Sequence, residues 1–369
     1  MLNQLFTVQL FKGSGLGAQL IQWEFLYLFG RLLGYQYVYQ DLTCQRSFSN
    51  AYNFLGVDKY NNLPPDTDLS QIPIIDCNIT DDMYSDEMED LESTKNHIKE
   101  LLDSSDTEKT QKIVRFNAGS WPQHQKIKRF VYKLSKDTNC RNLFKAELNL
   151  PFLYWKTREK MPVNIPLRHD KIKLVLHIRK GDTAIVNIND ELFSCWQYKI
   201  EPDGSSKVSV ERIKGTHKSL AQNFETSDYY DVLKKLFLEL GEHNFSVIVI
   251  SDGYDRSFQR IRNAASNLDL KLDDIERAET FYKKDYDVFS THSNVHCIIG
   301  EKEDQFYKSV HALASCDAVI YGRGTFATSI VEYLRFSNDN PVMFSMANKK
   351  NVNSLVAKLK SKFSSHFLF

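Results

Sequence analysis

The chain has 369 residues, a length that suits two domains better than one. Apolar residues make up 42% of it and charged residues 25%, which is ordinary globular composition, so a substantial core can form. Lys plus Arg equals Asp plus Glu, 47 each, and this balance gives no reason to expect binding to nucleic acid or to an anionic membrane surface.

Three features bear on where the protein works. The N-terminal sequence MLNQLFTVQLFKGSG lacks the long apolar core of a signal peptide. No run of about 18 apolar residues occurs, so no membrane span is predicted. The six cysteines form no C-x-x-C pair, which favours thiols in a reducing compartment. Together these features predict a cytoplasmic protein.

The N-terminal part begins like a doubly wound α/β domain. Leu5–Leu10 is a short apolar run of strand formers, and a glycine-rich turn follows it. Leu16–Leu33 then carries apolar residues at helical spacing, and Gly34 is placed to end that helix. Tyr35–Tyr39 is the expected second strand, followed by Asp41. Strand, glycine turn, helix and strand make up the first unit of such a domain.

The middle of the chain is less regular. Asn50–Asp106 is acidic and interrupted by prolines, and within it only Asp81–Leu102 is a helix candidate. Ile113–Phe116 predicts a strand, and Trp121–Leu134 predicts a basic amphipathic helix. The charged, proline-containing segment Glu159–Lys173 is the expected linker.

After the linker, strands and helices alternate. Strands are expected over Lys173–Ile178, Phe245–Ile250, Val295–Ile299, Asp317–Tyr321 and Pro341–Phe344. Helices are expected over Asp228–Gly241, Arg256–Leu268, Glu303–Ser315, Thr325–Phe336 and Val352–Phe363, and Thr183–Glu225 is expected to be an irregular insertion. Successive β–α units predict a parallel sheet with helices on both faces.

The predicted fold class is therefore α/β, with two Rossmann-like domains that face a cleft and a C-terminal helix. The expected divisions are an N-terminal domain over 1–165, a C-terminal nucleotide-binding domain over 166–345 and the final helix within 346–369. Ligands of such sheets bind outside the carboxyl ends of the strands, so the residues just after each strand are the candidate site residues.

The first strand of the C-terminal domain ends in His177-Ile178-Arg179-Lys180-Gly181-Asp182. His177 and Arg179 point to the same side of a strand. Arginine suits bidentate binding of a diphosphate and would stabilise the charge that develops on a diphosphate leaving group. This strand end therefore predicts a phosphate site.

Two other strands of the same sheet also end in polar groups. Ser251-Asp252-Gly253 follows the second strand, where Asp252 could accept hydrogen bonds from a base or a ribose. Gly322–Ser329 follows the fourth strand and runs into a helix, so that its glycines, hydroxyls and helix N-terminus form an anion site. Each segment alone is commonly a turn or a cap. Their equivalent positions in one sheet predict a nucleotide diphosphate site.

Four segments resemble motifs of the fucosyltransferase superfamily, which includes α1,2-, α1,6- and protein O-fucosyltransferases. Their order along the chain and their spacing also agree with this superfamily. His177–Asp182 resembles the H-x-R-x-G/T-D motif, and Ile250–Asp252 resembles the strand that ends in Ser/Thr-Asp. Asp317–Ile320 followed by Gly324–Ser329 resembles the third motif. Gly15–Leu20 is similar to the N-terminal G-L-G-N-Q motif, with Ala in place of Asn.

The resemblance implies a GT-B-like fold and an inverting transfer from GDP-fucose to a glycan or glycoconjugate, with no metal and no other cofactor. It places Arg179 at the β-phosphate and His177 and Asp252 at the guanosine. Gly15 and Gly17 would let the N-terminal loop approach the donor. The residues that would hold the diphosphate all come from the third motif: Thr325, Phe326, Thr328 and Ser329.

The base that takes the proton of the acceptor hydroxyl stays open. Asp182 is one candidate, Asp41 is a weaker one, and the donor phosphate itself is the third. Arg179 and Asp182 are accordingly the two candidate catalytic residues.

Other functions remain in competition. Gly13–Ala18 also fits the dinucleotide fingerprint G-x-G-x-x-A, with Asp41 after the next strand, which would indicate an NAD(P)-dependent oxidoreductase. A transferase that uses another nucleotide sugar and a non-catalytic sugar-nucleotide or glycan-binding protein are the remaining alternatives. Asp66-Thr67-Asp68 has the D-x-D form of a metal site, but its acidic, proline-rich surroundings favour a solvated loop.

Overall fold

The structure is a computed structural model of the whole chain. It describes residues 5–10, 15–38, 51–56, 72–79, 112–117, 147–200, 206–213, 224–322, 324–335 and 340–367, together with the isolated positions 96, 100, 126, 127, 129 and 131. The predicted helices over Asp81–Leu102 and Trp121–Leu134 lie outside the described residues apart from those isolated positions.

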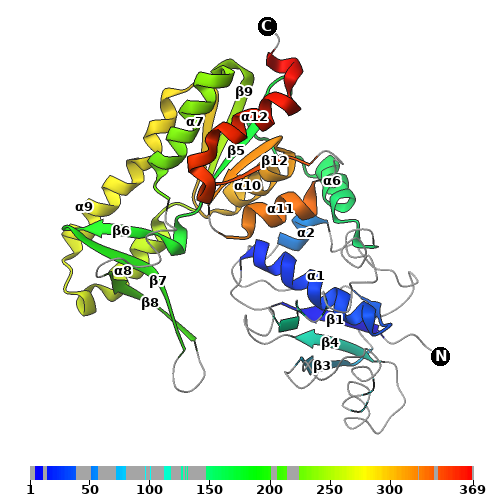
Figure 1. Ribbon diagram of the computed structural model, residues 1–369. Helices are drawn as coiled ribbons and strands as arrows, with labels where there is room; N and C mark the ends of the chain where they lie inside the picture. Colours follow the sequence, from blue (N-terminus) through cyan, green and yellow to red (C-terminus); the bar gives the residue numbers. More distant parts are fainter. Residues whose placement is uncertain are drawn as a thin grey trace. The chain divides into compact units, whose positions relative to one another are not determined.

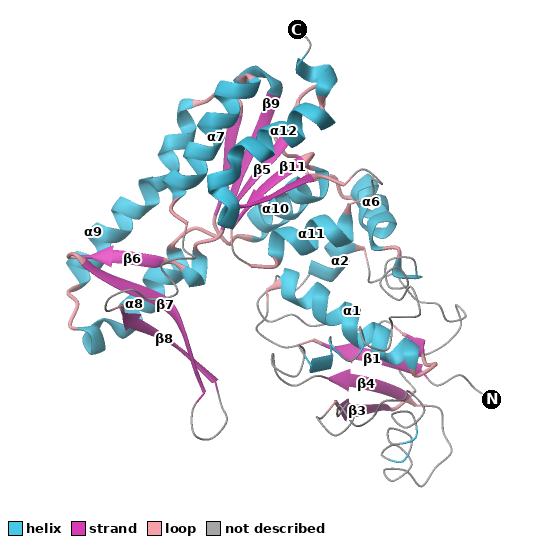
Figure 2. Ribbon diagram, in the orientation of Figure 1, coloured by secondary structure: helices cyan, strands magenta, loops and turns pink. Residues whose placement is uncertain are grey.

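The chain forms two compact units. The N-terminal unit comprises Met1–Pro162 and Thr328–Phe336, and the C-terminal unit comprises Val163–Ala327 and Ser337–Phe369. Each unit contains a parallel sheet with helices, which confirms the predicted α/β class (Figures 1 and 2). Within the described part of the chain, no helix combines the length and the apolar character needed to cross a bilayer.

The N-terminal unit is built on a parallel sheet in the order β2-β1-β4-β3. Its strands are β1 (Leu5–Gln9), β2 (Gln36–Tyr37), β3 (Ile74–Asn78) and β4 (Ile113–Asn117), and its helices include α1 (Leu16–Leu32), α2 (Ala51–Leu55) and α6 (Leu150–Lys160). Helix α1 is buried on nearly every side, as its many apolar residues require. Gly34 follows its end with a φ of +84°, the left-handed conformation that glycine allows.

A helix from late in the chain completes this unit. Helix α11 (Phe326–Leu334) begins after the fourth strand of the C-terminal unit, but its residues from Thr328 onward belong to the N-terminal unit. The Tyr333 hydroxyl donates to the buried carboxylate of Glu24 in α1. The indole N–H of Trp155 in α6 donates to the Leu334 carbonyl at 3.1 Å. These bonds fix α11 between the first helix of the chain and α6.

The C-terminal unit holds a parallel sheet in the order β10-β9-β5-β11-β12. The strands are β5 (Ile172–Ile178), β9 (Phe245–Ser251), β10 (Val295–Ile299), β11 (Ala318–Tyr321) and β12 (Val342–Ser345). From β5 the chain runs outward through β9 to β10 and then crosses back to β11 on the other side. The order reverses between β5 and β11, so that pair of strands is the topological switch point.

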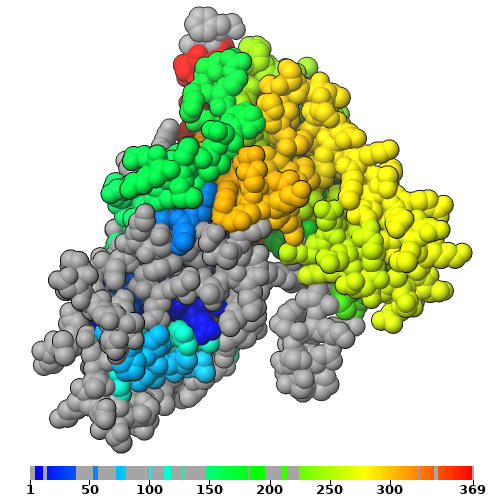
Figure 3. All heavy atoms as spheres, turned by 180° about the vertical axis from the view of Figure 1, so that it is seen from behind, coloured from blue at the N-terminus to red at the C-terminus, as the bar shows by residue number. Residues whose placement is uncertain are grey.

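Helices cover both faces of this sheet. The helices of this unit are α7 (Thr226–Leu240), α8 (Asp255–Leu268), α9 (Leu272–Lys283), α10 (Glu303–Ser315) and α12 (Val352–Lys362), of which α8 and α9 pack against each other after β9. Helix α7 packs against α12 on one face, and α10 lies on the opposite face (Figure 1). Helix α10 reaches the molecular surface, where its atoms are orange in Figure 3. The strands and helices predicted for this unit are confirmed to within two residues, but its helix α9 was not predicted.

The prediction of an irregular insertion over Thr183–Glu225 is wrong. The segment contains an antiparallel sheet of β6 (Ile185–Ile188), β7 (Glu191–Ile200) and β8 (Ser206–Arg212), which packs against α8 and α9. Asn189 and Asp190 both have positive φ, 50° and 63°, and form the two-residue turn between β6 and β7. An Asn-Asp pair between apolar runs is a signal for such a hairpin.

Candidate functional site

The carboxyl ends of three neighbouring strands carry the candidate residues. β5 leads into Arg179, β9 into Asp252, and β11 into the loop before Thr325. Because β9, β5 and β11 are adjacent in the sheet, these chain segments meet at one edge of the C-terminal unit. The edge includes the switch point, where doubly wound sheets bind ligands.

Arg179 lies directly against the β11–α11 loop. A Cβ atom placed on Gly324 would overlap the Arg179 guanidinium, so the side chain passes over the bare α-carbon of this glycine. Gly324 has a φ of +101°, which L-residues rarely adopt. Thr325 and the first turn of α11 follow immediately. A guanidinium beside a helix N-terminus concentrates positive potential and hydrogen-bond donors at one place, as an anion site requires.

His177 is the last residue but one of β5, and its side chain is only 7% exposed. Burial, with a contribution from the Arg179 charge, lowers its pKa to about 3, so the imidazole is neutral at physiological pH. Its ring centroid lies 5.6 Å from that of Phe326, and the Phe306 ring of α10 lies 6.1 Å beyond Phe326. A neutral imidazole and two phenyl rings thus form an aromatic row next to the cationic Arg179.

The low pKa of His177 makes a prediction about acid stability. The unfolded chain takes up this proton near pH 6.5, whereas the folded protein does so only near pH 3, so the unfolded state binds more protons between these values. Stability must therefore fall as the pH falls through this window. We expect the melting temperature of His177→Gln to fall less than that of the wild type between pH 6.5 and 4. Circular dichroism would give the melting temperature against pH for the wild type, for His177→Gln and for His169→Gln, which replaces an exposed histidine and serves as the control. Three parallel curves would contradict the prediction.

The turn after β5 is held in place by the loop after β9. The Lys180 amide donates to Asp252 Oδ1 at 2.9 Å, the Gly181 amide donates to the Gly253 carbonyl at 2.5 Å, and the Ser257 hydroxyl donates to the Gly181 carbonyl. Gly181 has a φ of +30°, and a Cβ there would overlap the Asp252 carboxylate. Asp252, predicted from the sequence to meet a nucleoside, thus also holds this turn.

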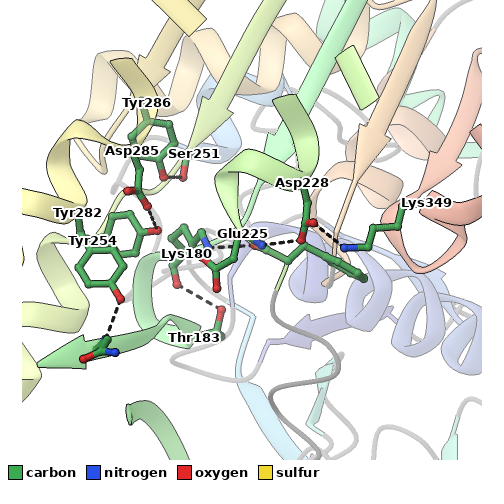
Figure 4. Close-up of polar contacts among 12 residues, drawn as sticks. Lys180, Thr183, Glu225, Asp228, Ser251, Tyr254, Tyr282, Asp285, Tyr286 and Lys349 are labelled. Carbon is green, nitrogen blue, oxygen red and sulfur yellow. Dashed lines mark hydrogen bonds and ion pairs between the residues drawn. The ribbon is translucent and has the colours of Figure 1, made fainter. Parts of the chain in front are cut away.

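Lys180 differs from its neighbour Arg179 in being completely buried. Its Nζ donates to the Phe224 carbonyl at 3.0 Å and lies 3.5 Å from Glu225 Oε2, at the start of α7 (Figure 4). The same ammonium lies 5.6 Å from the centre of the Tyr254 ring. This lysine therefore faces the scaffold and not the edge where Arg179 meets Gly324.

A polar network extends behind Lys180 (Figure 4). The Tyr254 hydroxyl donates to Asp285 Oδ2 at 2.8 Å, and the Ser251 and Tyr286 hydroxyls are 2.7 Å apart. Burial raises the pKa of Asp285, opposed by the Tyr254 hydrogen bond and the Lys180 charge. Burial also raises the pKa values of Tyr254 and Tyr286, so both phenols stay protonated.

The first turn of α7 is fixed by a second lysine. Asp228 accepts the Glu225 amide at 3.0 Å on one oxygen and the Lys349 ammonium at 2.6 Å on the other. Lys349 comes from the short 3-10 helix Met346–Asn351 after β12. Chain segments after β5 and after β12 therefore both bind the start of α7.

The other predicted site residues are placed as follows. Thr325 directly precedes α11 at the switch point, and Phe326 is the first residue of that helix. Thr328 and Ser329 belong to the N-terminal unit, and the Ser329 side chain is 2% exposed. Asp182 lies in the 3-10 turn Gly181–Thr183, and its side chain is outside the described residues.

The two N-terminal glycines lie at the start of α1. Gly15 is its N-cap residue and is exposed, with a φ of −73° and no atom within 4 Å of an added Cβ, whereas Gly17 is buried in the first turn. Nothing within the described structure therefore requires glycine at position 15.

Sequence reasoning missed two features of this edge. The burial of Lys180 depends on contacts with Phe224 and Glu225, which are far away in the sequence, so no local pattern indicated it. Phe306 stands in the first turns of α10 and in no motif, so only the three-dimensional row with Phe326 and His177 singles it out.

The sequence also contains one pattern of a metal site and one of a dinucleotide site. Among the described residues, no three His, Cys, Asp or Glu side chains are grouped as a metal ion would require. Asp66, Asp68, Gly13, Ser14 and Asp41, which carried the D-x-D and dinucleotide patterns, lie outside the described residues.

Comparison with known proteins gives a fold likeness only. No protein-family model matches the sequence, and no curated protein matches it. The chain is similar to solved structures of fucosyltransferases. POFUT1 with GDP-fucose is 10% identical with a TM-score of 0.36, covering 93% of this chain and 97% of that one. Apo POFUT1 is 12% identical with a TM-score of 0.38, covering 93% and 98%. A mutant of Arabidopsis thaliana FUT1 with GDP is 12% identical with a TM-score of 0.32, covering 92% and 72%.

Proposed function

We propose that this chain is an inverting glycosyltransferase that transfers fucose from GDP-fucose to a hydroxyl of a glycan or glycoconjugate, without a metal ion. The observation that carries the proposal is the contact of Arg179 with Gly324 at the switch point between β5 and β11. A cation held beside a helix N-terminus at this place suits a diphosphate. The resemblance of four sequence motifs to the fucosyltransferase superfamily supports guanine and fucose as the rest of the donor.

In this proposal Arg179 binds the β-phosphate and stabilises the negative charge that GDP gains as the glycosidic bond breaks. His177 and Asp252 line the guanosine site. A neutral, buried imidazole supports that role, because it can exchange hydrogen bonds with a base but cannot attract a phosphate by charge. The residues proposed for the diphosphate are Thr325, Phe326 and Thr328 at the start of α11. Ser329, which the same motif includes, has a buried side chain and is not part of the proposal.

Inversion needs a base that takes the proton of the acceptor hydroxyl as the hydroxyl oxygen attacks the anomeric carbon. Asp182 is our first candidate, because it directly follows the turn that Asp252 and Gly253 hold next to Arg179. The proposed site of action is the cytoplasm. The described cysteines, Cys77, Cys195, Cys297 and Cys316, support it, since they are thiols and not disulfides.

A panel of nucleotides tests the function. We expect GDP to raise the melting temperature more than UDP, CMP or NAD, because a ligand that binds only the native state stabilises it, and at equal concentration the tighter ligand stabilises it more. A larger shift with UDP or CMP would remove fucose from the proposal and leave a nucleotide-sugar transferase. A shift with NAD alone would favour the oxidoreductase.

Release of GDP from GDP-fucose in excess EDTA completes this test. Release under these conditions distinguishes an enzyme from a non-catalytic binding protein and is the expected result. Activity that disappears in EDTA and returns with Mn²⁺ or Mg²⁺ would contradict the metal-independent part of the proposal.

A further inference from the structure

We propose that Lys180 is a positioning residue: its buried ammonium holds the start of α7 so that α7 supports the loop that lies against Arg179. The inference deepens the proposed function and rests on it for the identity of the ligand. It assigns different tasks to two adjacent cations, since Arg179 faces the ligand edge and Lys180 faces the scaffold.

The Lys180 side chain contacts the two residues that precede α7. Lys180 is 0% exposed, and its Nζ donates to the Phe224 carbonyl at 3.0 Å beside the Glu225 carboxylate at 3.5 Å. A buried ammonium without partners is strongly unfavourable, so these contacts and the Tyr254 ring determine where the side chain can lie. Phe224 and Glu225 are in turn the residues that lead into the first turn of α7.

The start of α7 in turn contacts the β11–α11 loop at Gly322. A Cβ on Gly322 would overlap the Tyr229 hydroxyl of α7 and would lie 3.7 Å from the Phe224 ring. The Tyr229 hydroxyl therefore leaves no room for a side chain at position 322, and the Phe224 ring lies nearby at ordinary van der Waals distance. Two residues further along, Gly324 lies against the Arg179 guanidinium. The start of α7 thus sets the position of the loop that contacts Arg179.

Arg179 is also held by the turn that follows it. Lys180 follows Arg179 directly in the chain, and its amide is bound to Asp252 at 2.9 Å. Arg179 is accordingly held from both sides, by the turn that Asp252 holds and by the loop that α7 supports. Loss of the Lys180 ammonium would loosen the second side, while the turn's backbone bonds and the Lys349–Asp228 pair remain.

The test compares Lys180→Met with Lys173→Met. Methionine has a similar length but no charge. Lys173 lies near the start of β5, at the opposite end of this strand from Lys180, and pairs with Asp317 at 3.8 Å. We expect Lys180→Met to bind GDP about tenfold more weakly by calorimetry, since small misplacements of a binding group weaken the interaction strongly. Lys173→Met should bind GDP like the wild type, and Lys180→Arg should recover part of the loss.

Hydrogen exchange without any ligand gives an independent reading. Lys180→Met should exchange faster in the segments 179–184, 224–229 and 322–326 and remain unchanged in the other strands of the sheet. A uniform increase across the C-terminal unit, or no increase, would overturn the positioning role. If the wild type binds no GDP, the proposed function fails, while the exchange result still decides the role of Lys180.

A second variant covers the case in which Lys180→Met does not fold. Tyr229→Phe removes only the hydroxyl that lies against Gly322. It should weaken GDP binding severalfold, with faster exchange confined to 322–326. Wild-type GDP affinity and exchange in Tyr229→Phe would contradict the path through α7.

Discussion

Arg179→Ala is expected to lower turnover by roughly 10²–10³-fold, the range found when one preorganised charge-stabilising donor is removed. Breaking the bond between the sugar and GDP places more negative charge on the β-phosphate in the transition state than in the ground state. A fixed guanidinium there therefore accelerates the reaction beyond its effect on binding. Steady-state kinetics with GDP-fucose would measure the loss in kcat.

Two controls accompany this variant, which are its melting temperature and the Arg179→Lys substitution. Arg179 is half-buried at the sheet edge, so the melting temperature should change little. Arg179→Lys should recover only part of the rate, because an ammonium cannot reproduce the planar fork of a guanidinium. Near-normal turnover in a folded Arg179→Ala protein would remove this motif from the donor diphosphate, whereas unfolding would indicate a structural ion pair.

Gly324→Ala is expected to lower kcat by about 10²-fold although it adds a single methyl group, because misplacing a catalytic group by an ångström has effects of this size. The new Cβ would overlap the Arg179 guanidinium, and the φ of +101° is unfavourable for alanine. The loop and the arginine must then move apart. Kinetics and GDP binding, measured together, would show whether both decline.

Gly34→Ala provides the matched control for the backbone effect. Gly34 has a φ of +84° but no atom within 4 Å of an added Cβ. Alanine there should cost about 1–3 kcal/mol in stability, from the left-handed backbone alone, without changing kcat. If Gly324→Ala behaved in the same way, its effect would be conformational and the contact with Arg179 would be irrelevant.

Much of this fold was predictable because local patterns and tertiary structure agree. Nearly continuous apolar runs such as Phe245–Ile250 became strands buried on both faces, and Gly34 ended α1 as predicted. The expected order of strands and helices was sufficient to bring the ends of β5, β9 and β11 to one edge, since parallel strands share their direction.

The remaining features depend on contacts between segments far apart in sequence. The interval Thr183–Glu225 lacks strong periodicity, and its strands are specified by packing against α8 and α9. Ser329 belongs to a motif that suggests ligand contact, yet its side chain is buried after α11 joins the N-terminal unit. The task of Lys180 is set by a carbonyl that precedes α7, and no spacing rule connects positions 180 and 224.

The membership of α11 in the N-terminal unit has a consequence for biosynthesis. A ribosome that has made residues 1–162 has not yet made the helix that supplies Tyr333 to Glu24 and Leu334 to Trp155. At about 5–20 residues per second, that helix follows roughly ten to thirty-five seconds later. During this interval the nascent N-terminal segment exposes surfaces that α11 will cover, including buried Glu24. The first part of the chain to leave the ribosome therefore cannot complete its core until most of the chain has been made.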